Sequence, residues 1–321
     1  RSHKAHCLSW HQRCWIMCTA IDAEPVGGPI GALIDAMSSS KCGAINKQLN
    51  DATDKETVLE ITSQTIQRMN AINLATSLHR LARIEKHKRA ERESLLRDKR
   101  FELLMDAIIS RAPDFSPRSV ADILWSLATL KYWPPVAVRP VLTQVALHLG
   151  RASTAAFEPQ HLTIVTWALG TLECKPVKLL ERIEEQALNS VGLLNTQNCA
   201  NLLWGFAKLK QPTTKLVPAV SDYLMSSGLI QQCKPVEVSD LAFACAVLGK
   251  PETSRLFLED LSTLARRNSK LNDFSSRQIV MLIWAFARLN IMPPDGCLDE
   301  WRETIVRFGQ QRPMLAADRN N

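Results

Sequence analysis

The sequence has few of the residues that mark β-sheets and tight turns, with only 2 tyrosines and 12 glycines in 321 residues. It also lacks segments in which apolar and polar residues alternate, the pattern of a half-buried strand. No apolar run approaches the roughly 18 residues that a membrane-spanning helix needs. Because 46% of the residues are hydrophobic, material for a large core is present. The composition therefore predicts an all-α protein without a membrane span.

Sequence signatures of common enzymes are missing as well. The chain has no Walker loop, no G-x-G-x-x-G after a strand, no H-E-x-x-H and no G-x-S-x-G. Six histidines and cysteines gather near the N-terminus without zinc-finger spacing: His3, His6, Cys7, His11, Cys14 and Cys18. Acidic pairs such as Glu184-Glu185 fall on expected helices and need no catalytic role. We therefore expect no active site, no metal and no cofactor.

The cysteines number nine, an odd total, and most occupy apolar positions of helical patterns. This distribution is typical of buried free thiols in a reducing compartment rather than of a disulfide framework. Residues 1–20 contain basic residues but no acid, as in an organelle transit segment. We expect residues 1–40 to be a leader or disordered segment.

Basic residues outnumber acidic ones by 39 to 32, and the excess is concentrated between Arg80 and Arg100, with nine basic and four acidic residues. Such a segment favours a polyanionic partner, because neutralised phosphates supply most sequence-independent affinity. A solvated helix is the alternative, since Glu85 and Arg89 have the spacing of an intrahelical ion pair.

One pattern recurs six times along the chain. The copies align without gaps and lie at residues 73–84, 119–130, 161–172, 198–209, 237–248 and 278–289, with sequences such as SVADILWSLATL and NCANLLWGFAKL. Counted in a fourteen-residue frame that opens two residues earlier, successive copies begin 46, 42, 37, 39 and 41 residues apart. A period near forty is typical of α-solenoids, whose units bury their apolar faces against their neighbours.

Proline and capping residues divide each copy into a helical hairpin. Signals such as Ser116-Pro117 and Asn195-Thr196 precede the frames, and prolines such as Pro212 and Pro251 follow them. We expect a second, long and charged helix at residues 86–111 and a helix pair at residues 45–69. The predicted architecture is a right-handed α-solenoid of about seven hairpins at residues 41–311, forming one elongated body, followed by a tail at 312–321.

The columns of the frame sort into arcs of a helical wheel. Columns four, seven, eight, eleven and fourteen are largely aliphatic, whereas columns five, ten and twelve are mostly small. Columns two, six and thirteen are polar in most copies and vary between copies. A repeat protein with a constant scaffold and polar residues that differ between repeats can recognise a linear polymer. RNA-binding proteins that contact one base per repeat work in this way. Any exposed outer face would vary in the same way, so both interpretations stay open.

The ninth column is aromatic in nearly every copy, and its members are His79, Trp125, Trp167, Trp204, Phe243 and Trp284. These rings can stack nucleic-acid bases. They can also wedge between adjacent repeats, the more ordinary use of a large ring, which is the favoured interpretation.

The repeated LLWxxAxL core and its proline turns resemble those of octotricopeptide repeat proteins. The segments INKQLNDA, VLEIT and NAINLATSLHRLAR are similar to the start of the helical region in FAST-kinase-like and RAP-domain proteins. The resemblance covers residues 45–308 and implies organellar RNA binding, in the mitochondrion or the chloroplast, for stabilisation, processing, splicing or translation of transcripts or ribosomal RNA. The PPPEW turn of the family is only partial here, and no RAP domain is recognised after Arg312, so that domain's activity is not implied.

The sequence thus predicts a non-catalytic protein that binds single-stranded RNA, messenger or ribosomal, along its inner surface. The alternatives are a protein-binding scaffold, such as a peripheral subunit of an organellar ribosome or ribonucleoprotein, and an enzyme with an unrecognised site. The candidate RNA-binding residues are Arg80, Arg83, Lys86, Lys88, Arg89, Arg118, Asp122, Gln160, Gln197, Asn201, Lys208, Asp240, Arg277 and Arg288.

Overall fold

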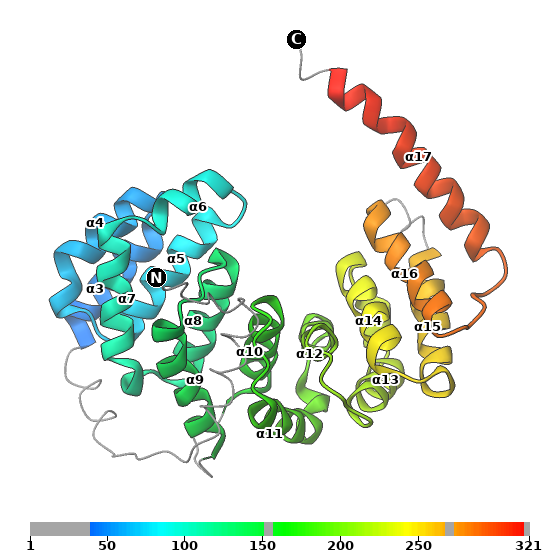
Figure 1. Ribbon diagram of the computed structural model, residues 1–321, viewed down its shortest axis with the longest axis horizontal. Helices are drawn as coiled ribbons and strands as arrows, with labels where there is room; N and C mark the ends of the chain where they lie inside the picture. Colours follow the sequence, from blue (N-terminus) through cyan, green and yellow to red (C-terminus); the bar gives the residue numbers. More distant parts are fainter. Residues whose placement is uncertain (1–38, 151–156, 267–272, 318–321) are drawn as a thin grey trace, which may run out of the picture. The chain divides into compact units, whose positions relative to one another are not determined.

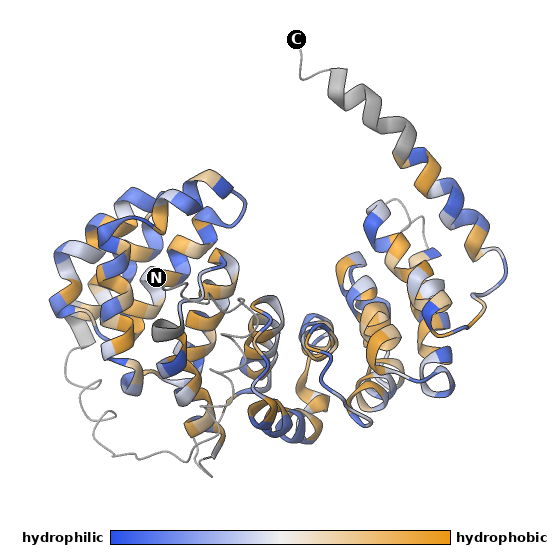
Figure 2. Ribbon diagram, viewed as in Figure 1, coloured by the Kyte–Doolittle hydropathy of each residue, from blue (hydrophilic) through white to orange (hydrophobic). Residues whose placement is uncertain are grey.

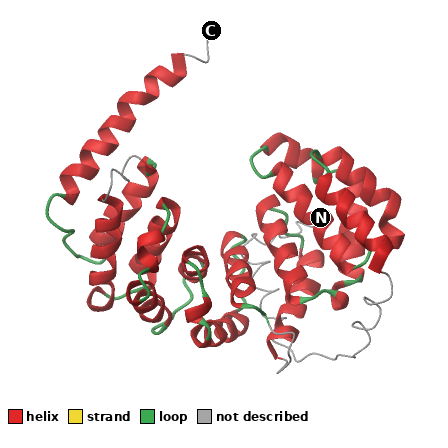
Figure 3. Cartoon of the chain, turned by 180° about the vertical axis from the view of Figure 1, so that it is seen from behind, coloured by secondary structure: helices red, strands yellow, loops and turns green. Residues whose placement is uncertain are grey.

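The computed structural model describes residues 39–150, 157–266 and 273–317, and within these ranges the chain forms helices and turns but no strand (Figures 1 and 3). The predicted all-α solenoid class is therefore confirmed. Within the structure the chain forms two compact units, residues 1–185 and residues 186–321. The predicted leader, the N-terminal histidine and cysteine group and the last residues of the tail lie outside the described residues.

Each repeat begins with one helix, its first helix, and continues with one or more helices that run back beside it. The first unit contains four such first helices in chain order. Its helices are α3 (Ser39–Asp51), α4 (Lys55–Thr65), α5 (Ala71–Glu85), α6 (Arg89–Leu95), α7 (Lys99–Ser110), α8 (Pro117–Leu130), α9 (Pro135–Gly150), α10 (Pro159–Thr171) and most of α11 (Val177–Asn189). Helices α3, α5, α8 and α10 pack side by side in this order. Helix α7 packs on α4, α5 and α9, which makes a second layer behind the first.

The second unit repeats this arrangement after the end of α11. Its helices are α12 (Thr196–Lys208), α13 (Leu216–Ser226), α14 (Pro235–Leu248), α15 (Pro251–Arg266), α16 (Ser276–Arg288) and α17 (Cys297–Ala317). Helices α12, α14 and α16 lie side by side, and α13 packs on α15 behind them. Short 3-10 turns precede four first helices, at Ile66–Arg68, Ala112–Asp114, Val191–Leu193 and Leu229–Gln232.

Each predicted frame begins at the first residue of a helix, which fixes the register of every repeat. The caps explain this agreement. The side chains of Ser116 and Asn195 accept hydrogen bonds from the backbone N–H groups of Ser119 and Asn198, at 3.3 and 2.8 Å. The Lys234 N–H donates to the Glu237 carboxylate at 2.9 Å. These bonds satisfy backbone groups at helix ends that have no partner inside the helix.

Four of the first helices, α8, α10, α12 and α16, end with a left-handed residue directly after the last leucine. Lys131, Glu173, Lys210 and Asn290 have φ values of 53°, 53°, 48° and 53°. The next residue then donates a backbone hydrogen bond into the last turn, as from Tyr132 to Leu127 and from Gln211 to Phe206, both at 3.0 Å. This is the Schellman closure of a helix, here made without glycine.

Burial follows the predicted columns. The aliphatic columns supply most buried side chains of the first helices, from Leu74 and Leu78 in α5 to Leu282 and Phe286 in α16. Figure 2 shows the apolar sides of the helices turned toward their neighbours within each unit. Small residues such as Ala121 and Ala200 are buried where first helices meet. Six cysteines of the described residues are buried thiols outside any disulfide, as predicted: Cys42, Cys174, Cys199, Cys233, Cys245 and Cys297.

Two local predictions for the charged segment were wrong. The expected single helix at residues 86–111 is broken into α6 and α7, because Asp98 caps a new helix by accepting the Arg100 N–H at 2.8 Å. The expected Glu85–Arg89 pair is replaced by an Arg89–Glu93 pair at 3.2 Å, since Glu85 is buried. The predicted helix pair upstream is present as α3 and α4.

Candidate nucleic-acid interface

The variable polar columns lie on the accessible face of the first helices. Column two is exposed where it is polar, at Arg118, Gln160, Gln197 and Arg277. Column six is half-buried at Asp122, Asn201 and Asp240, and column thirteen is exposed at Lys208 and Arg288. Thr129, which occupies column thirteen of α8, is buried and is therefore not part of this accessible polar face. The columns therefore form polar rows across α8 and α10 in the first unit and across α12, α14 and α16 in the second.

The aromatic column forms a stacked ring pair in each unit. His79 of α5 stacks on Trp125 of α8, with ring centroids 4.7 Å apart and planes inclined by 26°. Phe243 of α14 stacks on Trp284 of α16, at 5.9 Å and 24°. The rings thus pack between neighbouring repeats, as the favoured interpretation required. Trp284 is still 39% exposed, so a face of this ring is also accessible to a ligand.

Arginine side chains surround the ring pair of the first unit. The pKa of His79 is lowered from 6.5 to about 4, chiefly by burial and further by the positive charges of Arg83, Arg80 and Arg118. The imidazole is therefore neutral at physiological pH. Arg118 also lies 4.0 Å from the Asp122 carboxylate, one turn along α8.

Part of the basic segment is used inside the first unit. The guanidinium group of Arg80 donates to the carbonyl oxygen of Ala52, which follows the end of α3. Arg100 pairs with Glu56 and Asp98 at 2.6 and 2.7 Å, and Lys55 of α4 pairs with Glu91 of α6. These contacts attach α6 and α7 to α4. Arg83, Lys86, Lys88 and Arg89 are the predicted members of this segment whose side chains are exposed.

The two acidic members of column six have raised pKa values. Burial raises the pKa of Asp240 to about 7, against the opposing charge of Arg277 on the next first helix. Burial also raises the pKa of Asp122, while Arg118 lowers it. A carboxyl group that becomes neutral near physiological pH repels a phosphate less than an ordinary aspartate does. Gln160, another predicted RNA-binding residue, donates a hydrogen bond from its side-chain amide to the Glu158 carboxylate at 2.6 Å.

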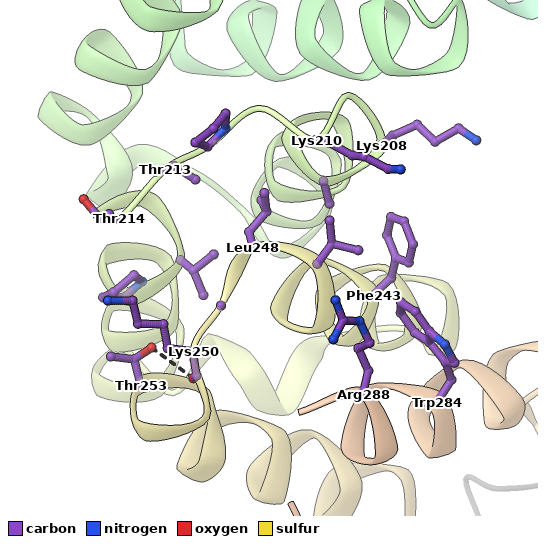
Figure 4. Close-up of a pocket in the computed structure, with 16 residues that line it drawn as sticks. Lys208, Lys210, Thr213, Thr214, Phe243, Leu248, Lys250, Thr253, Trp284 and Arg288 are labelled. Carbon is purple, nitrogen blue, oxygen red and sulfur yellow. Dashed lines mark hydrogen bonds between the residues drawn. The ribbon is translucent and has the colours of Figure 1, made fainter. Parts of the chain in front are cut away.

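A pocket of about 880 Å³ lies in the second unit, where the C-terminal ends of α12, α14 and α16 meet the starts of α13 and α15 (Figure 4). Stacking of repeats in one orientation brings the ends of successive first helices to the same edge. Lys208 and Arg288, both predicted, therefore reach one pocket from helices 80 residues apart in numbering. Phe243 and Trp284 form part of its wall.

Two cations of this pocket were missed by the sequence prediction. Lys210 is the left-handed residue after α12, and Lys250 directly precedes α15. Both follow the repeat frame instead of lying inside it, so a search restricted to the helical columns overlooks them. Lysines in the turns after the frames were the signal that could have revealed them. Among the sixteen lining residues, all of them described, four are cationic and none is acidic.

Residues 39–150, 157–266 and 273–317 contain no group of three histidine, cysteine or acidic side chains placed to hold a metal ion. None of the helices within them has the length and apolar character to cross a membrane.

Comparison with known proteins adds one relative. No protein-family model matches the chain. The chain is similar to a RAP domain-containing protein, chloroplastic, of Oryza sativa subsp. japonica, with 21% identity. The similarity covers 84% of this chain but only 42% of the rice protein, so the chain spans less than half the length of that relative. The likeness to RAP-domain proteins that the sequence indicated is therefore supported.

Proposed function

We propose that this chain is a non-catalytic, organellar RNA-binding helical-repeat protein, which acts on transcripts or ribosomal RNA in their stabilisation, processing, splicing or translation. The octotricopeptide and FAST-kinase-like features of the sequence belong to this proposal. The RNA is single-stranded, because the exposed ring of Trp284 needs an unpaired base on which to stack.

One observation carries the proposal: cations and an accessible aromatic ring meet in the same pocket of the second unit, at the ends of the first helices. Proteins that bind single strands combine these two elements, because cations attract the backbone and rings stack the bases. The polar columns beside the rings supply groups that can contact base edges. Asn201 and Arg277 are examples, one half-buried and the other exposed.

The organellar part of the proposal has one support. The rice relative carries a chloroplastic name. The buried thiols are compatible with either the chloroplast or the mitochondrion, because the described cysteines form no disulfide that would require an oxidising compartment.

A protein-binding scaffold, such as a peripheral component of an organellar ribosome or ribonucleoprotein, is the second candidate. It is favoured by half-exposed apolar side chains on first helices, namely Ile72, Val236 and Val280, each 51% exposed. A contiguous patch of such side chains would mark a contact with a protein partner. Under this alternative, RNA is unnecessary for assembly.

Crosslinking of the native protein in its organelle, followed by sequencing of attached RNA, tests the function. We expect enrichment of a few transcripts or ribosomal segments, and an affinity of the purified chain for them that falls linearly with the logarithm of salt concentration. The bound RNA should keep its length during incubation. Recovery of proteins but no RNA would favour the scaffold, and shortened RNA would contradict the absence of catalysis.

A further inference from the structure

We propose that the pocket of the second unit, which we call the 208–288 pocket, holds one nucleotide of single-stranded RNA, with the base on Trp284 and the phosphates among Lys208, Lys210, Lys250 and Arg288. The assignment rests on the proposed function and goes beyond it, because it names a ligand unit and a place.

The base side of the pocket is the ring pair. Phe243 covers one side of Trp284, with a ring inclination of only 24°, and Trp284 remains 39% exposed. Phe243 thus lies against one side of the indole, and the exposed part of the ring leaves room for a second planar group. Figure 4 shows the Arg288 guanidinium beside the two rings. A planar guanidinium group can stack on a base or contact its phosphate.

The phosphate side is formed by elements that follow the first helices. Lys208 ends α12, Lys210 lies in the turn after it, and Lys250 directly precedes α15. The first turn of α15 lies here too, with Thr253 lining the pocket. The positive end of a helix dipole adds to the attraction for an anion. No carboxylate lines the pocket among these described residues, so nothing in its wall opposes a phosphate.

The two sides together select a ligand that is both planar and anionic. An acidic peptide would use the cations and leave the exposed indole face without a matching group. A neutral aromatic ligand would use the ring and leave four positive charges unpaired by the ligand. A nucleotide satisfies both sides, and a volume of about 880 Å³ accommodates one together with its backbone neighbours.

The experiment measures binding of an oligouridylate and of the same strand with abasic ribose in place of each uridine. Trp284→Ala should weaken binding of the oligouridylate roughly 5- to 100-fold, and leave the abasic strand unchanged, because stacking on one aromatic contributes on this scale. Trp284→Phe should restore most of the loss. Lys250→Gln should weaken both strands and lower the slope of log affinity against log salt by about 0.7.

Matched variants control for fold and for total charge. Arg255→Gln and Arg302→Gln remove exposed cations of the same unit outside the pocket, next to Glu259 and Asp299, and should leave both affinities nearly unchanged. Circular dichroism should show the same helix content in all variants.

The outcomes separate this inference from the proposed function. If the unmodified chain binds no RNA, the proposed function fails and this inference with it. If the chain binds oligouridylate and Trp284→Ala binds it equally well, the proposed function stands and the pocket assignment is overturned. An equal loss on both strands would also overturn the assignment, because the ring would then act only structurally. Competition by polyglutamate that depends on Trp284 would assign the pocket to a peptide.

Discussion

The same repeat column builds two different environments in the two units. In the first unit His79 stacks on Trp125, and the arginines around this pair include Arg80, which contacts a backbone carbonyl, and Arg118, which lies beside Asp122. In the second unit Phe243 stacks on Trp284 next to a pocket lined with cations and free of acids. Aromatic and basic residues are abundant in both. The two units therefore differ in which charged groups surround a similar ring pair, and we expect the acid-free pocket of the second unit to bind an anion better.

The comparison predicts that removing the same number of charges from each unit lowers the affinity for RNA by different amounts. Lys208→Gln, Lys210→Gln, Lys250→Gln and Arg288→Gln in one variant should reduce affinity for single-stranded RNA roughly 100-fold near 0.1 M salt, since about four phosphate contacts are lost. The matched variant carries Arg83→Gln, Lys86→Gln, Lys88→Gln and Arg89→Gln. It should lose less affinity, because the ring pair nearest to these side chains, His79 and Trp125, is half-buried, whereas Trp284 is exposed.

Fluorescence anisotropy with a labelled RNA, repeated over a salt series, measures both the affinity and the number of contacts. A larger loss from the basic segment of the first unit would reverse the comparison. In that case residues 83–89 would be the main phosphate-binding region, as the sequence alone suggested.

Column six gives a second comparison, through the carboxyl groups of Asp240 and Asp122. The folded pKa of Asp240 is about 7, above the ordinary 3.8, so the folded chain takes up a proton between these values. Its contribution to stability is therefore present at low pH and is lost as pH rises toward 7 and beyond. Asp240→Asn should raise the free energy of unfolding by on the order of 1–3 kcal/mol at about pH 8, with solvent screening favouring the lower figure.

Urea unfolding at about pH 4 and pH 8 checks this expectation, and the gain should vanish at the lower pH. Asp122→Asn should shift stability in the same direction by less, because a second carboxylate, Glu237, adds to the rise of the Asp240 pKa and no such group acts on Asp122. Equal gains from the two variants would show that burial in the two units is equivalent.

The stacked ring pair of column nine contains a titratable group only in the first unit, where His79 occupies the position that Phe243 has in the second. The pKa of His79 is about 4 in the fold and 6.5 ordinarily, so the unfolded chain binds more protons between these values. Stability is complete above about pH 6.5 and falls as pH falls toward 4. His79→Phe, which copies Phe243, should remove on the order of 1–2 kcal/mol of this pH dependence.

Differential unfolding curves of His79→Phe and the unmodified chain over this pH range provide the measurement. Phe243→His is the reciprocal variant and should introduce a similar decline in the second unit. Parallel curves for all three proteins would mean that His79 is not desolvated by its ring partner and the nearby arginines.

Much of the fold could be predicted because its determinants are local. The caps Ser116 and Asn195 and the buried columns follow from neighbours within one helix, and the first helices began where the frames predicted. The site was only partly predictable. Arg80 resembles any exposed arginine in sequence, but its partner Ala52 lies 28 residues away. Lys250 and Arg288 meet only because α15 and α16 end up in adjacent repeats, which no column of a single helix records.

The division into two units was also hidden from the sequence. The frames at residues 159–172 and 196–209, on either side of the boundary, have the same columns as the other frames. The pattern records only how a helix faces its neighbours within a hairpin, so it does not mark a boundary between units. The boundary falls within α11, whose sequence has an ordinary amphipathic pattern. The handedness of the solenoid and the reading of bases by columns two, six and thirteen stay predictions.

The smallest expected effect concerns the turns that end the first helices. Lys131 in the first unit and Asn290 in the second both have φ of 53°, a region in which a Cβ atom is strained. Lys131→Gly should stabilise the chain by up to about 1 kcal/mol, reduced by the greater freedom of glycine in the unfolded state. Asn290→Gly should give less, because asparagine tolerates this conformation. Gly249→Ala provides the contrast, since its φ is −78° and an added Cβ would lie 2.6 Å from the Cys245 carbonyl oxygen. It should destabilise the second unit, and thermal unfolding of the three variants would show whether the shared closure or the packing around it limits each turn.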